Sequence, residues 1–139
     1  MLFRSGRIAM WHALGDAVTP LDLDTVAACI FTDPEIASVG ITQRHVLSGD
    51  AEAEVMVLPL RTNARAKMQE SEDGFVKLFC LPTNHTVIGG VVVAPRASEL
   101  IYAVALAVTH RLSVEDLAAT FTVYPSLSGS IAEAARRLH

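Results

Sequence analysis

The stretch ASELIYAVALAVTH, residues 97–110, limits the possible folds of this chain more than any other segment. It is long enough only for a helix, and it is apolar on nearly every side. A helix at the surface of a globular protein normally carries one apolar stripe. A helix that is apolar nearly all round is instead buried on several sides, either within the fold or against another subunit. The sequence therefore predicts a helix at the centre of the packing and an apolar surface that favours self-association.

The segments before this helix carry the period of β-strands. Residues 51–60 alternate between apolar and polar side chains, and residues 75–81 and 86–94 are rich in β-branched and aromatic residues. Turn-forming residues at 82–84 predict that the last two strands form an antiparallel hairpin. Residues 25–31 predict a further strand with both faces buried. Strands followed by helices, without strict alternation, predict an α+β fold in which an antiparallel β-sheet packs with helices.

Caps and prolines predict the remaining elements. These are a short helix at 6–15, an extended connector at 16–24, a helical turn opened by Pro34, a surface helix from the cap Thr42 through Leu47 ended by Gly49-Asp50, a helix that begins at Ser113, and a last helix that begins with the capping box Ser-Ile-Ala-Glu at 130–133.

Composition places the chain among compact globular domains. With 51% hydrophobic and 19% charged residues it is unlike disordered sequences. Its net charge of −4 argues against nucleic acid as a partner, because phosphate binding needs a basic face. No apolar run approaches the roughly 18 residues of a membrane span, and the segment that follows Arg4 and Arg7 is too short and too polar at His12 for a signal peptide. Cys29 and Cys80 lie in apolar surroundings and are predicted to be buried core thiols of a cytoplasmic protein.

No motif read from the residues alone predicts a catalytic or metal site. The dinucleotide fingerprint, the P-loop and the zinc-protease motif are absent. The lone pair Gly89-Gly90 is more typical of a bulge or a close backbone approach than of a phosphate cradle. The five histidines lack ligand spacing, and Cys80 with His85 would supply too few ligands for a metal. The serines of YPSLSGS at 124–130 do not match a nucleophile elbow, so helix capping explains them better.

Six segments, in order, resemble the C-terminal dimerisation domain of the pyridine nucleotide-disulfide oxidoreductases, and the lipoamide dehydrogenase branch most of all. The likeness covers residues 22–138. The segments are FTDPEIASVG at 31–40, R-x-x-A-R-A-K at 61–67, DGFVKL at 73–78, VIGG at 87–90, ASELI at 97–101 and YPSLS at 124–128.

The resemblance implies a division of the chain into two parts. Residues 1–21 look like the tail helix of a missing FAD domain plus a connector, with residues 1–5 foreign to it, and residues 22–139 look like the dimerisation domain. Asp16 is not assigned to flavin, because the family places its flavin-contacting Gly-Asp motif upstream of this helix. Since the redox C-x4-C and the dinucleotide fingerprints are missing, the chain is expected to be about the last third of an enzyme that uses FAD and NAD(P)H.

The chain departs from the lipoamide dehydrogenases at one place. Those enzymes carry H-P-T-x-x-E, whose His takes a proton from a redox thiol pair of the partner subunit and whose Glu orients the imidazole. Tyr124 stands at the His position and Gly129 at the Glu position. Tyrosine, with an ordinary pKa of about 10, is a poor general base at neutral pH, and glycine cannot orient a base. The pattern is similar to that of actinobacterial NAD(P)H quinone reductases, whose chemistry needs no thiol relay.

The resemblance thus implies the dimerisation domain of an FAD-dependent NAD(P)H oxidoreductase of the quinone reductase type that forms a homodimer. Tyr124 and Pro125 are expected to form only an edge of the partner subunit's flavin site, with the peptide bond between them commonly cis in the family. The isolated chain is expected to bind neither FAD nor NAD(P)H and to catalyse nothing. Three alternatives stay open: a freestanding interaction module, an inactive pseudo-enzyme domain, and a piece of a true dihydrolipoamide dehydrogenase.

Overall fold

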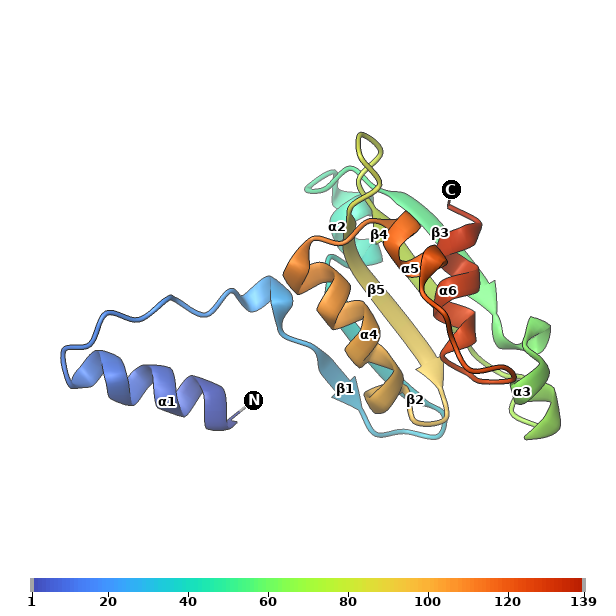
Figure 1. Ribbon diagram of the computed structural model, residues 1–139, viewed down its shortest axis with the longest axis horizontal. Helices are drawn as coiled ribbons and strands as arrows, with labels where there is room; N and C mark the ends of the chain where they lie inside the picture. Colours follow the sequence, from blue (N-terminus) through green and yellow to red (C-terminus); the bar gives the residue numbers. More distant parts are fainter. Residues whose placement is uncertain (1, 139) are drawn as a thin grey trace.

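The computed structural model describes residues 2–138 and consists of one five-stranded antiparallel sheet with helices packed on it (Figure 1). The α+β architecture predicted from the sequence is confirmed. Met1 and His139, the ends of the two predicted parts of the chain, lie outside the described residues. The strand order is β1-β2-β5-β4-β3, and all neighbours are antiparallel. The strands are β1 (Ala28–Ile30), β2 (Glu35–Gly40), β3 (Glu54–Pro59), β4 (Phe75–Cys80) and β5 (Val87–Ala94).

Helices α4, α5 and α6 lie over one face of the sheet, while α1 lies apart from it at the end of an extended connector (Figure 1). The helix predicted at 6–15 is present but begins earlier. The α-helices are α1 (Leu2–Ala13), α2 (Gln43–Ser48), α3 (Ala64–Met68), α4 (Ala97–His110), α5 (Val114–Ala119) and α6 (Gly129–Arg136), and two short 3-10 helices are η1 (Leu23–Thr25) and η2 (Leu60–Thr62). Among the described residues, no helix is both long and apolar enough to cross a membrane.

The core lies between the sheet and helices α4 and α6, and close packing explains why the sheet carries a glycine pair. Val104 of α4 is fully buried, and its Cγ1 would lie 2.8 Å from a Cβ placed on Gly90. A Cβ on Gly89 would collide with the backbone carbonyl of Ile41. The hairpin of β4 and β5 has its register shift at Phe79, opposite this pair. The predicted close backbone approach is therefore confirmed, together with the predicted hairpin.

Helix α4 has the predicted bounds, and its apolar surface is divided between two environments. Ala97, Ile101, Val104 and Ala107 are buried on the sheet. Tyr102 stands 67% exposed on the opposite side of the helix. An isolated copy therefore covers only part of the apolar helix surface.

The segment after Pro34 differs from the prediction. Instead of opening a helical turn, Pro34 follows a cis peptide bond and is succeeded by the strand β2. The inward side chains of β2, Ala37 and Val39, are buried, and the strand pairs with β1 on one side and β5 on the other. Sheet pairing over the whole of Glu35–Gly40 satisfies more backbone groups than one helical turn would, so the tertiary context decides this segment.

The first strand is shorter and more exposed than predicted. Only Ala28–Ile30 pair, at the edge of the sheet, and Ile30 is 61% exposed. The prediction that both faces of residues 25–31 are buried is wrong, because Ala28 and Ile30, which share one face of the strand, are exposed and Cys29 on the other face is only half-buried.

Two of the three predicted caps are confirmed. Thr42 begins α2, which ends at Gly49, and Ser113 begins α5 in a capping box with Asp116. The box predicted at 130–133 is wrong, because α6 already begins at Gly129 and Ser130 lies inside it.

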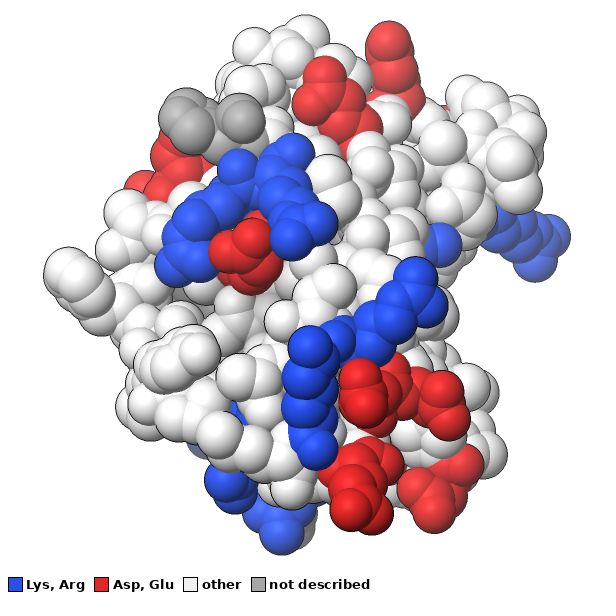
Figure 2. Space-filling model, turned by 90° about the vertical axis from the view of Figure 1, so that its right-hand side faces the viewer, with Lys and Arg blue, Asp and Glu red and all other residues white. Residues whose placement is uncertain are grey.

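Charge is mixed on the side of the molecule that carries α3 and α6, where acidic and basic side chains lie next to one another (Figure 2).

Candidate functional site at the Tyr124 tip

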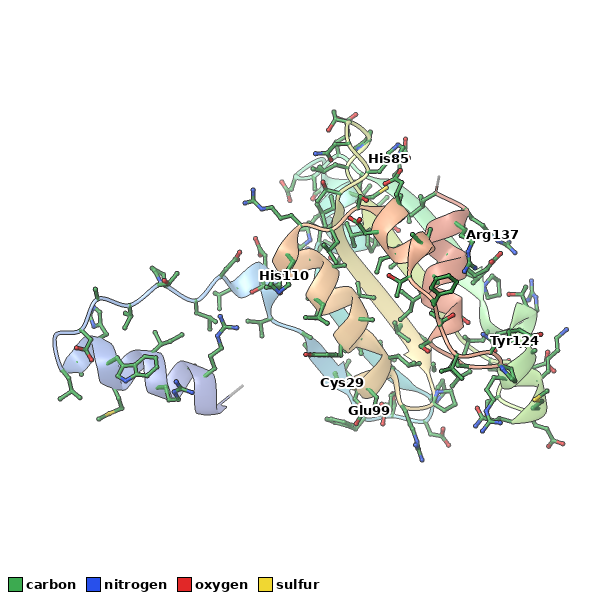
Figure 3. The ribbon with its side chains drawn as sticks, in the orientation of Figure 1. Cys29, His85, Glu99, His110, Tyr124 and Arg137 are labelled. Carbon is green, nitrogen blue, oxygen red and sulfur yellow. The ribbon has the colours of Figure 1, made fainter. Side chains whose placement is uncertain are left out.

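The loop between α5 and α6 forms an exposed tip that carries Tyr124. Tyr124 is 85% exposed, Val123 is 77% exposed and Phe121 is fully exposed. The Tyr124–Pro125 peptide bond is cis, as the resemblance predicts. Tyr124 lies near α3 at one end of the sheet, whereas His85 lies at the other end (Figure 3). The tip thus presents aromatic and apolar side chains that find little cover within their own chain, which is typical of a surface that meets another molecule.

Hydrogen bonds on the C-terminal side of Pro125 form the base of the tip. The hydroxyl of Ser126 accepts from the backbone N–H of Gly129 at 3.1 Å and lies 3.0 Å from the hydroxyl of Ser128. The N–H of Ser130 donates to the carbonyl of Leu127 at 3.0 Å. Ser126 therefore satisfies a donor at the beginning of α6, which is the capping role predicted for this group of serines rather than that of a nucleophile.

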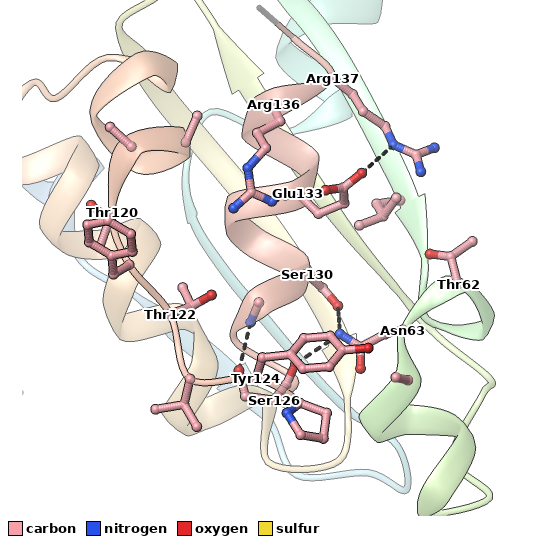
Figure 4. Close-up of a pocket in the computed structure, with 18 residues that line it drawn as sticks. Thr62, Asn63, Thr120, Thr122, Tyr124, Ser126, Ser130, Glu133, Arg136 and Arg137 are labelled. Atoms are coloured by element: carbon pink, nitrogen blue, oxygen red, sulfur yellow. Dashed lines mark hydrogen bonds and ion pairs between the residues drawn. The ribbon is translucent and has the colours of Figure 1, made fainter.

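Asn63, from the beginning of α3, also holds this base (Figure 4). Its side-chain nitrogen donates to the backbone carbonyl of Ser126 at 2.9 Å and to the hydroxyl of Ser130 at 2.7 Å. Its side-chain oxygen accepts from the N–H groups of Arg65 and Ala66 at 2.8 and 3.2 Å. One asparagine thus joins the first turn of α3 to the residue that follows Pro125 and to α6.

No acid–base pair occupies the positions where the resemblance places one. Gly129 offers no side chain to orient a base. A Cβ built on Gly129 would meet only the hydroxyls of Ser126 and Thr122, at 3.5 and 3.7 Å, which are ordinary contact distances. Glycine is therefore not required by the backbone there, and a Cβ fits without displacing its neighbours. Because residue 129 is a glycine, it supplies no carboxylate next to Tyr124.

A cavity of about 480 Å³ lies beside the tip, between it, η2 with α3, and α6 (Figure 4). Thr62, Thr122 and Gly129 line it together with Tyr124. At its far end Glu133 pairs with Arg136 at 3.0 Å and with Arg137 at 3.2 Å. The hydrogen bonds from Arg137 and Arg136 lower the pKa of the Glu133 carboxyl, so this group is an ionised structural partner and not a proton donor at neutral pH.

The two thiols lie in different environments. Cys80 is fully buried, and its burial, helped by the nearby charges of Glu54 and Glu115, raises the pKa of the thiol to about 11. Cys29 is only half-buried on the edge strand, so the prediction of a core thiol is confirmed for Cys80 alone. Desolvation, and to a smaller extent the negative charge of Glu35, raises the pKa of the Cys29 thiol as well. Neither thiol has the lowered pKa of a catalytic cysteine.

His85 makes a local pair and no metal site. Its Nδ1 lies 2.9 Å from a carboxylate oxygen of Glu115, and this hydrogen bond raises the pKa of the imidazole. The described residues contain no group of three or more His, Cys, Asp or Glu side chains placed to hold a metal ion. The pair joins the β4–β5 turn to α5, far from the tip.

Sequence reasoning missed Asn63 and Ser130 as parts of the site. Asn63 stands at an unspecified position of the segment R-x-x-A-R-A-K. An asparagine directly before Ala64-Arg65-Ala66 is a helix-start signal that would have marked it as a cap. Its second role, toward Ser126 and Ser130, has no local signal, because its partners are more than sixty positions away along the chain.

Comparison with known proteins gives one family and two groups of relatives. The family model described as "Pyridine nucleotide-disulphide oxidoreductase, dimerisation domain" matches residues 26–135. An NAD(P)H dehydrogenase (quinone) from Mycobacterium tuberculosis is 62% identical over 96% of this chain and 27% of its own length. A dihydrolipoyl dehydrogenase from Haloferax volcanii is 35% identical over 95% of this chain and 28% of its own length. The chain thus spans little more than a quarter of these relatives.

Solved structures agree with the fold. The crystal structure of LpdA from Mycobacterium tuberculosis superposes with a TM-score of 0.92 and 60% identity, over 98% of this chain and 30% of that one. The flavoprotein disulfide reductase RclA from Escherichia coli superposes with a TM-score of 0.85 at 22% identity, over 96% of this chain and 31% of that one, and at that identity it supports the fold alone.

Proposed function

Because the chain belongs to the dimerisation-domain family of the pyridine nucleotide-disulphide oxidoreductases, we propose that it pairs the subunits of an FAD-dependent NAD(P)H oxidoreductase of the quinone reductase type. In this proposal residues 1–21 are the tail helix and connector of an FAD domain, and residues 22–139 are the dimerisation domain. The short share of each relative that the chain spans, 27% of the quinone dehydrogenase, agrees with a longer parent.

The observation that carries the choice of quinone chemistry is the tip itself. By resemblance, Tyr124 and Gly129 take the places where lipoamide dehydrogenases have a His and a Glu, within a tip whose base is held by hydrogen bonds from Asn63 and Gly129. Dithiol reduction needs a base that accepts a proton from a thiol, and neither residue supplies one. Electron transfer from a reduced flavin to a quinone needs no such base on this tip. The relative that is 62% identical carries the name of a quinone dehydrogenase, which supports the same choice.

The residues of the tip fit the edge of a flat cofactor. Tyr124 offers a planar apolar ring with one hydroxyl donor, and Pro125 offers an apolar edge; both line the cavity beside α6. FAD bound in the partner subunit would supply the electron transfer, while Tyr124 and Pro125 exclude water and contact its edge. A pyrophosphate is held elsewhere, since this chain has no glycine-rich turn that opens a helix.

Pairing of two copies is the second part of the proposal. Ile30 on β1 and Tyr102 on α4 are 61% and 67% exposed, and Phe31, which follows Ile30, is 78% exposed. Gathered in one patch, apolar side chains of this size mark an interaction surface. In this proposal, as the resemblance implies, each tip lies at the flavin site of the opposite subunit. The free thiols of Cys29 and Cys80 agree with the predicted cytoplasmic location of the parent.

The experiment compares two acceptors in the longer protein that contains this chain. With NADH or NADPH as donor, 2,6-dimethyl-1,4-benzoquinone should be reduced and lipoamide should not. Lipoamide reduction at a comparable rate would identify a dihydrolipoamide dehydrogenase instead, and a protein without bound FAD that reduces neither acceptor would favour an interaction module or a pseudo-enzyme. The 139-residue chain alone should be colourless, and a stoichiometric flavin spectrum would contradict the proposed division into domains.

A further inference from the structure

The side chain of Asn63 uses all of its hydrogen-bonding capacity. A carboxamide has two N–H donors and two acceptor lone pairs. Both donors are used, toward the Ser126 carbonyl and the Ser130 hydroxyl, and both lone pairs are used, toward the N–H groups of Arg65 and Ala66. The main chain of Asn63 is anchored too, since its N–H donates to the carbonyl of Leu60 at 2.8 Å.

This arrangement defines the orientation of the amide. If the oxygen and nitrogen of Asn63 were exchanged, the NH2 group would face two backbone N–H donors and the oxygen would face the Ser126 carbonyl. Four favourable contacts would then become at least three unfavourable ones, so a single orientation is stable. Only asparagine combines an acceptor for the cap with donors for the tip at this length of side chain.

The two groups to which the Asn63 side chain donates lie at the base of the tip. The Ser126 carbonyl belongs to the residue directly after Pro125, and Ser130 is a buried polar side chain in the first turn of α6, only 1% exposed. Tyr124 itself is 85% exposed, so packing of its own ring within the chain cannot hold it. The place from which Tyr124 projects is therefore set by bonds at the base of the loop.

We propose that Asn63 is a positioning residue: its carboxamide clamps the backbone after Pro125 to α3 and α6, and thereby sets the place and direction in which Tyr124 is presented to the partner subunit. The functional consequence rests on the proposed function, because it assumes that the partner presents its flavin there. The clamp itself is a property of this chain and is tested without any activity.

Exchange of Asn63 for aspartate separates the clamp from the helix cap. The Asn63→Asp carboxylate still accepts from Arg65 and Ala66 as an N-cap. Its other oxygen cannot donate to the Ser126 carbonyl, and two acceptors then face each other. The Ser130 hydroxyl can turn to donate to this oxygen, so the cap and the contact with α6 are retained, while the bond that clamps the backbone after Pro125 is lost. The matched control is Asn84→Asp, the same chemical change at the chain's other asparagine, whose oxygen accepts from Thr86 N at 3.1 Å in an exposed turn.

Amide hydrogen exchange in the 139-residue chain measures the result. In Asn63→Asp the exchange rates of the Gly129 and Ser130 amides should rise about tenfold or more, as expected when local hydrogen bonds are lost. Rates in α3 and in β4 and β5 should stay within about twofold, and Asn84→Asp should leave the tip unchanged. Unchanged rates at Gly129 and Ser130 would overturn the proposal. Equal acceleration throughout the sheet would overturn it as well, because Asn63 would then support the fold in general and not the tip.

The longer protein supplies the functional readout. Asn63→Asp should lower kcat/KM for 2,6-dimethyl-1,4-benzoquinone about tenfold, as a displacement of a positioned group does, and should leave the single-turnover reduction of flavin by NAD(P)H unchanged. Unchanged kcat/KM despite a mobile tip would remove Asn63 from the positioning role. A parent without quinone reductase activity would refute the proposed function, while the exchange experiment would still decide whether the clamp exists.

Discussion

Replacing Gly40 with alanine should lower the free energy of unfolding by about 2 to 5 kcal/mol, the sum of two costs that the structure separates. Gly40 ends β2 with φ of +70°, and left-handed backbone costs a non-glycine residue about 1 to 2 kcal/mol. A Cβ there would also collide with the carbonyl oxygen of Ile88 and lie 2.8 Å from the Cα of Gly89. Both neighbours are backbone of β5, which cannot turn aside, so a further cost of about 1 to 3 kcal/mol is expected.

Gly49 provides the matched control for the backbone strain. It follows α2 with φ of +79°, but a Cβ there meets nothing within 4 Å. Gly49→Ala should therefore cost only the strain, about 1 to 2 kcal/mol. Urea unfolding followed by far-UV circular dichroism measures both variants, at one protein concentration because pairing of copies would couple stability to concentration. If the two variants agree within about 0.5 kcal/mol, the close approach of Gly40 to β5 is refuted.

Four other outcomes are expected. In the longer protein, Tyr124→Phe should leave quinone reduction within a few-fold, and a loss of about a hundredfold or more would show that Tyr124 transfers a proton. In light scattering at micromolar concentration, the 139-residue chain should have the mass of a dimer. Tyr102→Glu should shift it toward monomer by placing a charge on the exposed side of α4. If the unsubstituted 139-residue chain is already monomeric, the pairing proposal is contradicted. The raised pKa of His85 means that its bond to Glu115 stabilises the fold below the ordinary histidine pKa and is lost as pH rises through the higher folded value, so His85→Gln should lower the urea midpoint at pH 5.5 but not at pH 8.5. Cys80, with its pKa near 11, should resist iodoacetamide at pH 8 until the chain unfolds, and rapid labelling in the native state would refute its burial.

Local patterns in the sequence were sufficient for the elements whose stability is decided by their own residues. The bounds of α4 follow from a segment that is apolar on nearly every side and long enough only for a helix, and the antiparallel pairing of β4 and β5 follows from two strands joined by a turn. Thr42 and Ser113 begin helices because their side chains and the residues three positions later cap each other. Such interactions are complete within a few residues, so the amino-acid order is enough to predict them.

Segments with neighbours distant in the chain were predicted less well. The residues after Pro34 carry a plausible helix-start signal, but they form β2 because β1 and β5 offer backbone partners on both sides. Ser130 resembles a cap in sequence, yet it is buried inside α6 and receives a hydrogen bond from Asn63. In both cases the local preference is worth less than the tertiary bonds that replace it.

The candidate site divides in the same way. From the sequence alone, the resemblance predicts that Tyr124 and Gly129 stand where a base and its partner would be, and this assignment stays a prediction. Only the tertiary structure decided how the tip is held, because the clamp brings Asn63 within 2.9 Å of the Ser126 carbonyl and 2.7 Å of the Ser130 hydroxyl. The physical reason is the distance along the chain over which each interaction acts. The side chain present at a position is fixed by the sequence, whereas a hydrogen bond between residues more than sixty positions apart forms only after folding has brought the two segments together.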